Sequence, residues 1–187
     1  PVVGQNEKKA YAVRIAGFEN TRVFEQYHRM AQASNLADFE DALKMMQSSM
    51  FNIIYADRTG NILYLFNGNI PERKEGDFEF WKGTIDGTKT KYIWNRTHPY
   101  KDLPRLLNPP SGFIQNCNDP PWTSTLPAGL DQGKFPAYMS SSWTPLRPQR
   151  AINLILNNPV ISYDQLIGIK HNTGMEAADR FLDDLLA

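Results

Sequence analysis

One stretch of sequence decides the fold of this chain: NIIYADRTGNILYLF, at residues 52–66. Its two halves, 52–57 and 62–66, are rich in β-branched and aromatic residues, which is typical of strands. Between them Gly60 can supply the left-handed residue of a turn without steric cost, so the stretch predicts a short-turn β-hairpin. Both strands are apolar at nearly every position, which indicates that helices cover one face of the sheet and a second sheet covers the other. The stretch therefore predicts a layered α/β sandwich.

Helical patterns lie on either side of this hairpin. Apolar residues recur at three- and four-residue spacing from Arg22, and Ser34 and Asn35 offer caps for the helix that follows. Ser162 and Gln165 form a capping box ahead of a later helix. Helices are expected at residues 22–31, 36–50, 149–156, from 162 onward and at 175–185, and a strand is expected at 10–15.

The middle of the chain is rich in proline. Eleven of the thirteen prolines fall between Pro71 and Pro148. Proline fixes φ and removes a backbone donor, so this part is expected to be loop-rich around short strands, of which residues 112–118 form the clearest. A chain of 187 residues with 41% hydrophobic composition suits one core, so residues 1–187 are expected to form a single domain. Its class is α+β, with antiparallel strands, flanking helices and a proline-rich central loop region.

Composition and charge exclude several classes of function. The 20 Lys and Arg balance 20 Asp and Glu, so no net field favours nucleic acid or an anionic membrane surface. The one cysteine, Cys117, cannot form an internal disulfide, and three scattered histidines give no zinc spacing, so no metal is assigned. No apolar stretch reaches the length of about 18 residues that a membrane helix needs. The sequence starts at Pro1 without an initiator Met, as an excised fragment is expected to do.

Four local patterns, in order along the chain, resemble those of the penicillin acylase (penicillin amidase) family within the N-terminal-nucleophile hydrolases. The most specific is the hairpin stretch with its continuation to residue 73, which is similar to N-x-x-Y-A-D-x-x-G-N-I-x-Y … G-x-x-P-x-R. The others are WKG at 81–83, similar to W-x-G; NPPSGFIQNCNDPP at 108–121, similar to N-P-x-x-G-x-I-x-N-x-N-N-x-P; and RPQRAINLIL at 147–156, similar to R-x-x-R-I-x-x-L-L. The residues after Pro1 and around Tyr11 also match, so the resemblance covers essentially the whole chain.

The resemblance implies a fold and a function. The chain is expected to be an interior fragment of the large (β) subunit, with part of an αββα N-terminal-nucleophile hydrolase sandwich. The full-length protein is then an amide hydrolase acting on N-acyl compounds such as β-lactam side chains, acyl-homoserine lactones or lipopeptide acyl groups. Its nucleophile is a Ser exposed by autoproteolysis at the start of the β subunit, upstream of Pro1. The chain alone is therefore expected to be inactive.

The resemblance also implies partners and a location. The partners are the α subunit and the N-terminal part of the β subunit of the same precursor, together with a small N-acyl amide substrate. Family members often hold a calcium ion with carboxylates, most of them from segments outside this chain, so no cofactor or metal ligand is assigned to residues 1–187. Export to the periplasm or secretion is implied by the resemblance alone.

By residue-to-residue match, Asn118 is the asparagine whose side chain donates to the oxyanion of the tetrahedral intermediate. Each such donor contributes on the order of 10²–10³ to the rate. From the residues alone, Asn118 is instead an Asx-turn residue ahead of Pro121. The position after this asparagine usually holds a second Asn in the family, and Asp119 departs from that pattern by adding negative charge close to the developing oxyanion.

Arg150 matches the family arginine near the active site, where a guanidinium orders the asparagine and the amine of the nucleophile. Without the match, Arg150 is a surface residue at a helix N-terminus. Strand alternation turns Cys117 away from its neighbours Asn116 and Asn118, which indicates an inert packed thiol. Asn116 is expected to satisfy local hydrogen bonding, and Asp57 to cap the hairpin turn.

Two other classes of function compete with amide hydrolysis. A non-catalytic binding or interaction domain would keep the amidase fold without the nucleophile. A sugar-binding module would use the tryptophans, whose irregular spacing in loops gives it little support; these are Trp81, Trp94, Trp122 and Trp143. The sequence upstream of Pro1 discriminates, because a hydrolase of this type needs Ser, Thr or Cys at a processing junction.

Overall fold

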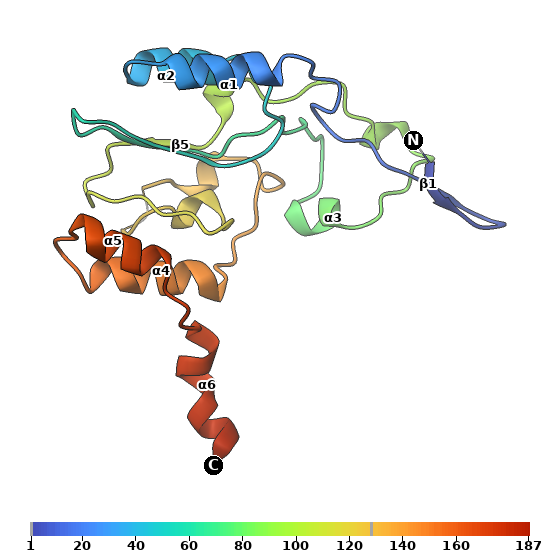
Figure 1. Ribbon diagram of the computed structural model, residues 1–187. Helices are drawn as coiled ribbons and strands as arrows, with labels where there is room; N and C mark the ends of the chain where they lie inside the picture. Colours follow the sequence, from blue (N-terminus) through green and yellow to red (C-terminus); the bar gives the residue numbers. More distant parts are fainter. Residues whose placement is uncertain (1, 128) are drawn as a thin grey trace. The chain divides into compact units, whose positions relative to one another are not determined.

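The computed structural model in Figure 1 describes residues 2–127 and 129–187, so Pro1, with which the family match begins, lies outside the described residues. The chain divides into two compact units built from alternating segments. Unit 1 consists of Pro1–Phe51, Asn67–Glu75 and Ile85–Leu103, and unit 2 consists of Asn52–Phe66, Gly76–Thr84 and Pro104–Ala187. The described residues form two small antiparallel sheets and six α-helices, which confirms the α+β class.

The hairpin expected at residues 52–66 is present in unit 2. Strand β3 (Ile53–Ala56) pairs antiparallel with β4 (Ile62–Leu65), with Ile53 opposite Leu65. Gly60 lies in the turn between them with φ of 90°. A third strand, β5 (Arg105–Leu107), pairs antiparallel with the other edge of β4 and gives the order β3-β4-β5. The sequence did not indicate β5, because its three residues are too few to show a pattern.

Burial differs between the two strands of the hairpin. In β4 the side chains of Leu63, Tyr64 and Leu65 are fully buried. In β3 burial alternates, and Ile54 keeps 48% of its surface exposed. The expectation that both faces of both strands are covered is therefore met by β4 and wrong for β3 within this chain. The physical reason is position, since β4 is the central strand and β3 lies at the edge of the sheet.

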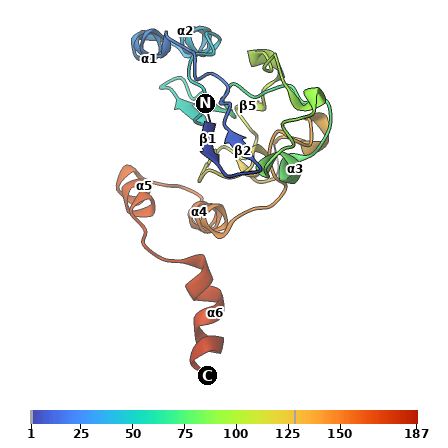
Figure 2. The same ribbon diagram turned by 90° about the vertical axis from the view of Figure 1, so that its right-hand side faces the viewer.

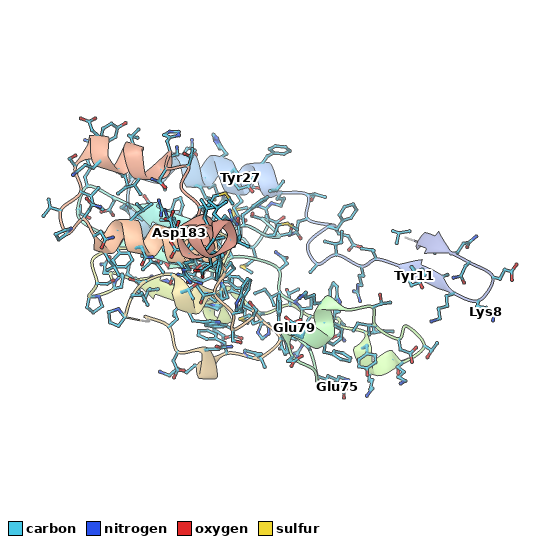
Figure 3. The ribbon with its side chains drawn as sticks, turned by 90° about the horizontal axis from the view of Figure 1, so that it is seen from below. Lys8, Tyr11, Tyr27, Glu75, Glu79 and Asp183 are labelled. Atoms are coloured by element: carbon cyan, nitrogen blue, oxygen red, sulfur yellow. The ribbon has the colours of Figure 1, made fainter. Side chains whose placement is uncertain are left out.

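The second sheet lies in unit 1 and has two strands. β1 (Val2–Gln5) pairs antiparallel with β2 (Ala10–Ala12), and every residue of both is exposed. Figure 3 shows Lys8 near the turn of this ribbon and Tyr11 on β2. The strand expected at 10–15 is thus present and ends at Ala12.

Two helices of unit 1, α1 (Val23–Gln32) and α2 (Leu36–Leu43), pack side by side (Figures 1 and 2). Asn35 caps α2 as expected, because its side chain accepts a hydrogen bond from Asp38 N at 3.0 Å. The expectation that this helix runs to residue 50 is wrong. Beyond α2, the side-chain oxygen of the buried Gln26 accepts from the backbone nitrogens of residues 47 and 48 at 2.6 and 3.1 Å, in place of helical carbonyls.

Four helices belong to unit 2: α3 (Phe78–Lys82), α4 (Leu146–Leu156), α5 (Tyr163–Lys170) and α6 (Glu176–Leu186). The capping box of α5 is confirmed, since the side chains of Ser162 and Gln165 each accept from the backbone nitrogen of the other, at 3.2 and 2.8 Å. Helix α4 contacts α6. None of the helices in the described ranges is long and apolar enough to cross a membrane.

The strand expected at residues 112–118 is wrong. Its backbone groups bond to a neighbouring loop, because Gln115 N donates to Ser124 O at 2.8 Å and Phe113 O accepts from Thr125 Oγ1 at 2.8 Å. Residues 113–116 are in no helix or strand, and the chain bends at Cys117 and Asn118. Four short 3₁₀ helices complete the proline-rich region, at Thr90–Tyr92, Tyr100–Asp102, Pro121–Thr123 and Gln132–Lys134. The expected loop-rich character of this region is confirmed.

Candidate functional site

The candidate site is a turn at residues 116–119, within the proline-rich region. Asn118 is exposed and has φ of 63°, in the left-handed region that asparagine tolerates better than most residues. Its backbone nitrogen donates to Asn116 Oδ1 at 3.1 Å, which is the hydrogen bond of an Asx turn. The Asx geometry read from the residues alone is therefore present, and it aims the side chain of Asn118 outward from the loop.

Arg147, in the first turn of α4, binds this turn from outside. Its Nη2 donates to Cys117 O at 2.6 Å and to Asn118 Oδ1 at 3.2 Å. A guanidinium has donors and no acceptor, so it can bind only the oxygen of the Asn118 amide. The amide nitrogen, Nδ2, has no hydrogen-bond partner among residues 2–127 and 129–187. The turn therefore presents one amide donor whose orientation is fixed by an arginine.

Asp119 lies on the inner side of the same turn and is 3% exposed. Its Oδ1 accepts from Cys117 N at 2.6 Å and from Asn116 Nδ2 at 3.2 Å. Its Oδ2 accepts from Gln115 Nε2 at 2.8 Å and from Thr123 Oγ1. Every one of these bonds is made within the loop, so the carboxylate that departs from the family pattern is bound by loop donors.

The charge of Asp119 acts on two neighbouring groups. Burial, reinforced by the negative charge of Asp119, raises the pKa of Tyr64 far above its usual range. Burial also raises the pKa of the Cys117 thiol, Asp119 raises it further, and the nearby Arg147 opposes this rise. A thiol with a raised pKa is a poor nucleophile at neutral pH, which agrees with the interpretation of Cys117 as an inert packed thiol.

The turn is tied to the hairpin of the same unit by Asn52. Its Nδ2 donates to Asn116 Oδ1 at 3.0 Å, so that oxygen receives both Asn52 and the backbone of Asn118. Asn116 thus serves local hydrogen bonding, as expected. The first residue of the hairpin pattern and the asparagines of the later pattern, far apart in sequence, form one network.

Arg150 lies one turn further along α4 and bonds elsewhere. Its Nη1 contacts Asp179 of α6, and its Nε and Nη2 donate to Asn172 Oδ1 at 3.3 and 3.2 Å. The structure thus brings Asn118 together with Arg147, which the sequence did not single out. A signal for Arg147 was present, because a cation in the first turn of a helix opposes the helix dipole and needs a local reason.

Asp57 caps the hairpin turn, which confirms its structural interpretation. Its Oδ1 accepts from the backbone nitrogens of Thr59 and Asn61 at 2.9 and 3.1 Å, and its Oδ2 accepts from Tyr55 OH at 3.0 Å. These hydrogen bonds, led by those from the side chains of Thr59 and Asn61, hold the pKa of Asp57 well below its usual range. The carboxylate is therefore ionised and engaged at neutral pH.

Within the described ranges, no group of three or more His, Cys, Asp or Glu side chains is arranged to hold a metal ion. No chemical step is therefore assigned to a metal here.

The family described as Penicillin amidase matches residues 1–187. Among curated proteins, an acyl-homoserine lactone acylase of Pseudomonas putida is 26% identical over 95% of this chain, and the penicillin acylase 2 proenzyme of a Pseudomonas species is 24% identical over 89%. Penicillin G acylase of Escherichia coli is 33% identical over 63% of this chain.

This chain corresponds to 25%, 20% and 14% of the lengths of those three proteins, so it spans about a quarter of their length or less. Among solved structures, a thermostable penicillin G acylase from Alcaligenes faecalis aligns with a TM-score of 0.70 at 20% identity, over 90% of this chain and 29% of that protein. That likeness extends to the fold of the described elements. The chain therefore belongs to the penicillin amidase family, a family of amide hydrolases.

Proposed function

We propose that the protein containing this chain is a penicillin-acylase-type amide hydrolase that cleaves N-acyl amide bonds, and that Asn118 donates to the oxyanion of its tetrahedral intermediate. The observation that carries the proposal is the hydrogen bond from Arg147 to Asn118 Oδ1, which leaves Nδ2 available. A rigid donor aimed at a developing negative charge costs no reorganisation when the charge forms.

The nucleophile in this proposal is an N-terminal Ser outside this chain. Its hydroxyl attacks the acyl carbonyl while its own α-amino group takes the proton, so no distant histidine is needed. The carbonyl oxygen then becomes an oxyanion, and Asn118 Nδ2 donates to it. Arg147 withdraws electron density through the amide oxygen, which strengthens the amide N–H as a donor. Arg147 thereby acts as a positioning residue.

Arg150 is proposed as a second orienting residue of the active site. Its bonds to Asn172 and Asp179 join α4 to the segment ahead of α6 and to α6 itself. Because α4 also carries Arg147, Arg150 would act on Asn118 through the placement of that helix.

The position of this chain in the whole protein is proposed from its family. We propose that this chain is an interior piece of the β subunit and contributes to an αββα sandwich completed by the α subunit and the rest of the β subunit. We also propose one domain for residues 1–187, which comprises both compact units. The name of one relative, a proenzyme, supports processing of a precursor, and we propose that this processing is autoproteolytic. Export to the periplasm, a calcium ion bound outside this chain and inactivity of the chain alone belong to the same proposal.

Substrate class is proposed from the relatives. Their printed names include acyl-homoserine lactone acylase and penicillin acylase, and the substrates share an acyl group on an amide nitrogen. An N-acyl amide is therefore the proposed substrate, with the acyl chain set by residues outside this chain.

The test uses the complete open reading frame that encodes this sequence. The protein is produced, its mass is measured to detect self-cleavage, and a panel of penicillins, acyl-homoserine lactones and acyl-peptides is assayed. We expect cleavage that exposes a Ser, Thr or Cys, and we expect Asn118→Ala to lower kcat by about 10²-fold or more. Full activity of processed Asn118→Ala would refute the role of Asn118. A frame with no such residue at a processing junction would instead make the protein a non-catalytic domain with the amidase fold.

A further inference from the structure

We infer that Asp119 is a positioning residue that fixes the direction of the Asn118 amide, and that this chain requires a carboxylate at that position. The inference rests on the proposed function and deepens it. Its basis is the set of donors that converge on the Asp119 side chain, together with the backbone conformation of Asn118.

The backbone nitrogen and the backbone oxygen of Cys117 both make hydrogen bonds to side chains. Cys117 N donates to Asp119 Oδ1 at 2.6 Å, and Cys117 O accepts from Arg147 Nη2 at 2.6 Å. Asn118 N donates to Asn116 Oδ1 at 3.1 Å. These bonds together hold Asn118 in the left-handed conformation, which asparagine tolerates better than most L residues.

Asp119 also holds the residue that binds the backbone of Asn118. Asn116 Nδ2 donates to Asp119 Oδ1 at 3.2 Å, which orients its amide so that Oδ1 faces Asn118 N. The carboxylate thus acts on Asn118 by two routes, one through the backbone of Cys117 and one through the side chain of Asn116.

Asparagine cannot replace the carboxylate in this loop. A carboxylate accepts at both oxygens, whereas an amide presents an NH₂ group on one side. On the Oδ1 side the donors are a backbone nitrogen and an Asn116 amide that cannot flip, because its oxygen already accepts from Asn52 and Asn118. An NH₂ group on that side would face two donors.

The Oδ2 side offers no better place for an NH₂ group. Gln115 Nε2 donates to Asp119 Oδ2 at 2.8 Å and to Thr123 O at 2.7 Å. Flipping the Gln115 amide to accept from an asparagine would bring its oxygen against the carbonyl of Thr123. Thr123 Oγ1 can turn its single proton to Pro120 O, which lies at 2.6 Å, and then accept, but Gln115 Nε2 remains a donor. The side chain at 119 therefore has to accept on both sides, and the carboxylate does so.

The experiment compares variants of the complete processed enzyme, with kcat normalised to the fraction of active sites in a burst assay. Asp119→Asn is expected to lower kcat about tenfold or more while KM changes less than about twofold, because the donor for the transition state is misplaced. Thr123→Val removes one bond on the Oδ2 side and leaves both Oδ1 bonds, so it should lower kcat by less than about threefold. If Asp119→Asn has wild-type kcat, or if Thr123→Val lowers kcat as much as Asp119→Asn does, the inference is wrong.

A double-mutant cycle separates positioning from general stability. In an Asn118→Ala background, Asp119→Asn should lower kcat no further, because the group that it positions is gone. An equal further loss would show that Asp119 acts independently of Asn118 and would overturn the inference. Should Asp119→Asn fail to fold, Asn116→Ala takes its place. Wild-type kcat in Asn116→Ala would then show that the inference is wrong. Full activity of Asn118→Ala alone would refute the proposed function, whereas inactive Asn118→Ala beside fully active Asp119→Asn would refute the positioning role only.

Discussion

Arg147 and Asn118, 29 residues apart, are joined by a hydrogen bond of 3.2 Å from guanidinium to amide oxygen. Arg147→Gln removes this bond and the one to Cys117 O, so we expect kcat to fall about tenfold or more. Arg147→Lys keeps the positive charge but lacks the planar set of guanidinium donors. Its kcat should therefore lie between those of the wild type and Arg147→Gln.

Arg150→Gln is the matched control, three residues away on the same helix. Since Arg150 bonds to Asn172 and Asp179 instead, its replacement should lower kcat less than that of Arg147. Steady-state kinetics of the processed enzyme decide between them, and a larger loss for Arg150→Gln would mean that Arg147 is not the residue that orients Asn118.

Replacing Asp57 should destabilise the hairpin turn in a pH-dependent way. The pKa of Asp57 is lowered in the fold, so its contribution is present above the unfolded value of about 4 and is lost as pH falls through the folded value. Thermal unfolding of Asp57→Asn and wild type should therefore differ most at neutral pH and converge under acid conditions. Asp183→Asn is the control, because the Asp183 side chain has no hydrogen bond among the described residues. If the difference in unfolding temperature between Asp57→Asn and the wild type grew in acid, this account would be contradicted.

Cys117 should react slowly with alkylating reagents at neutral pH, because burial raises the pKa of its thiol. The rate of alkylation should rise with pH to a midpoint above that of a free thiol, about 8.5. Arg147→Gln should move the midpoint higher still, since the guanidinium favours the thiolate. Intact-mass spectrometry follows the reaction, with the denatured protein as reference, and rapid labelling of the native enzyme at neutral pH would show the thiol to be activated.

Gln26 should stabilise the segment after α2. Gln26→Leu keeps the apolar bulk but leaves the backbone nitrogens of Gln47 and Ser48 without acceptors, at a cost of about 1–3 kcal/mol. We expect faster hydrogen exchange in the peptide covering these two residues. Exposed Gln32 on the same helix provides the control, and Gln32→Ala should leave that peptide unchanged. Unaltered exchange in Gln26→Leu would mean that other groups hold the segment.

The sequence predicts the elements whose determinants are local. The hairpin around Gly60 and the capping box of Ser162 and Gln165 are confirmed because a turn residue or a cap acts within a few positions. The elements that the sequence predicted wrongly depend on contacts with other segments of the chain. The segment ending at Asn118 has strand-like residues, yet its backbone bonds to Ser124 and Thr125 instead of a strand.

The candidate site was likewise predicted only where its determinants are local in sequence. Asn118 was found by its place in a family pattern, and its turn geometry follows from the Asx tendency of the residues around it. The family pattern singled out Arg150, and the sequence could not show that Arg147 bonds to Asn118 instead, because residues three apart share one face of a helix. It also could not show that Asp119 is buried against four donors, because these donors, although all within four residues of it, meet at one carboxylate only in the folded loop.

The ribbon formed by β1 and β2 bears on how the protein should be handled. A sheet of two strands has no central strand, so each strand offers one side whose peptide groups are unpaired, and Val2 and Val3 add apolar surface that is 62% and 64% exposed. Unpaired strand edges with apolar side chains promote association between copies. Residues 1–187 produced alone should therefore scatter light increasingly with concentration, and enzymology belongs on the complete polypeptide.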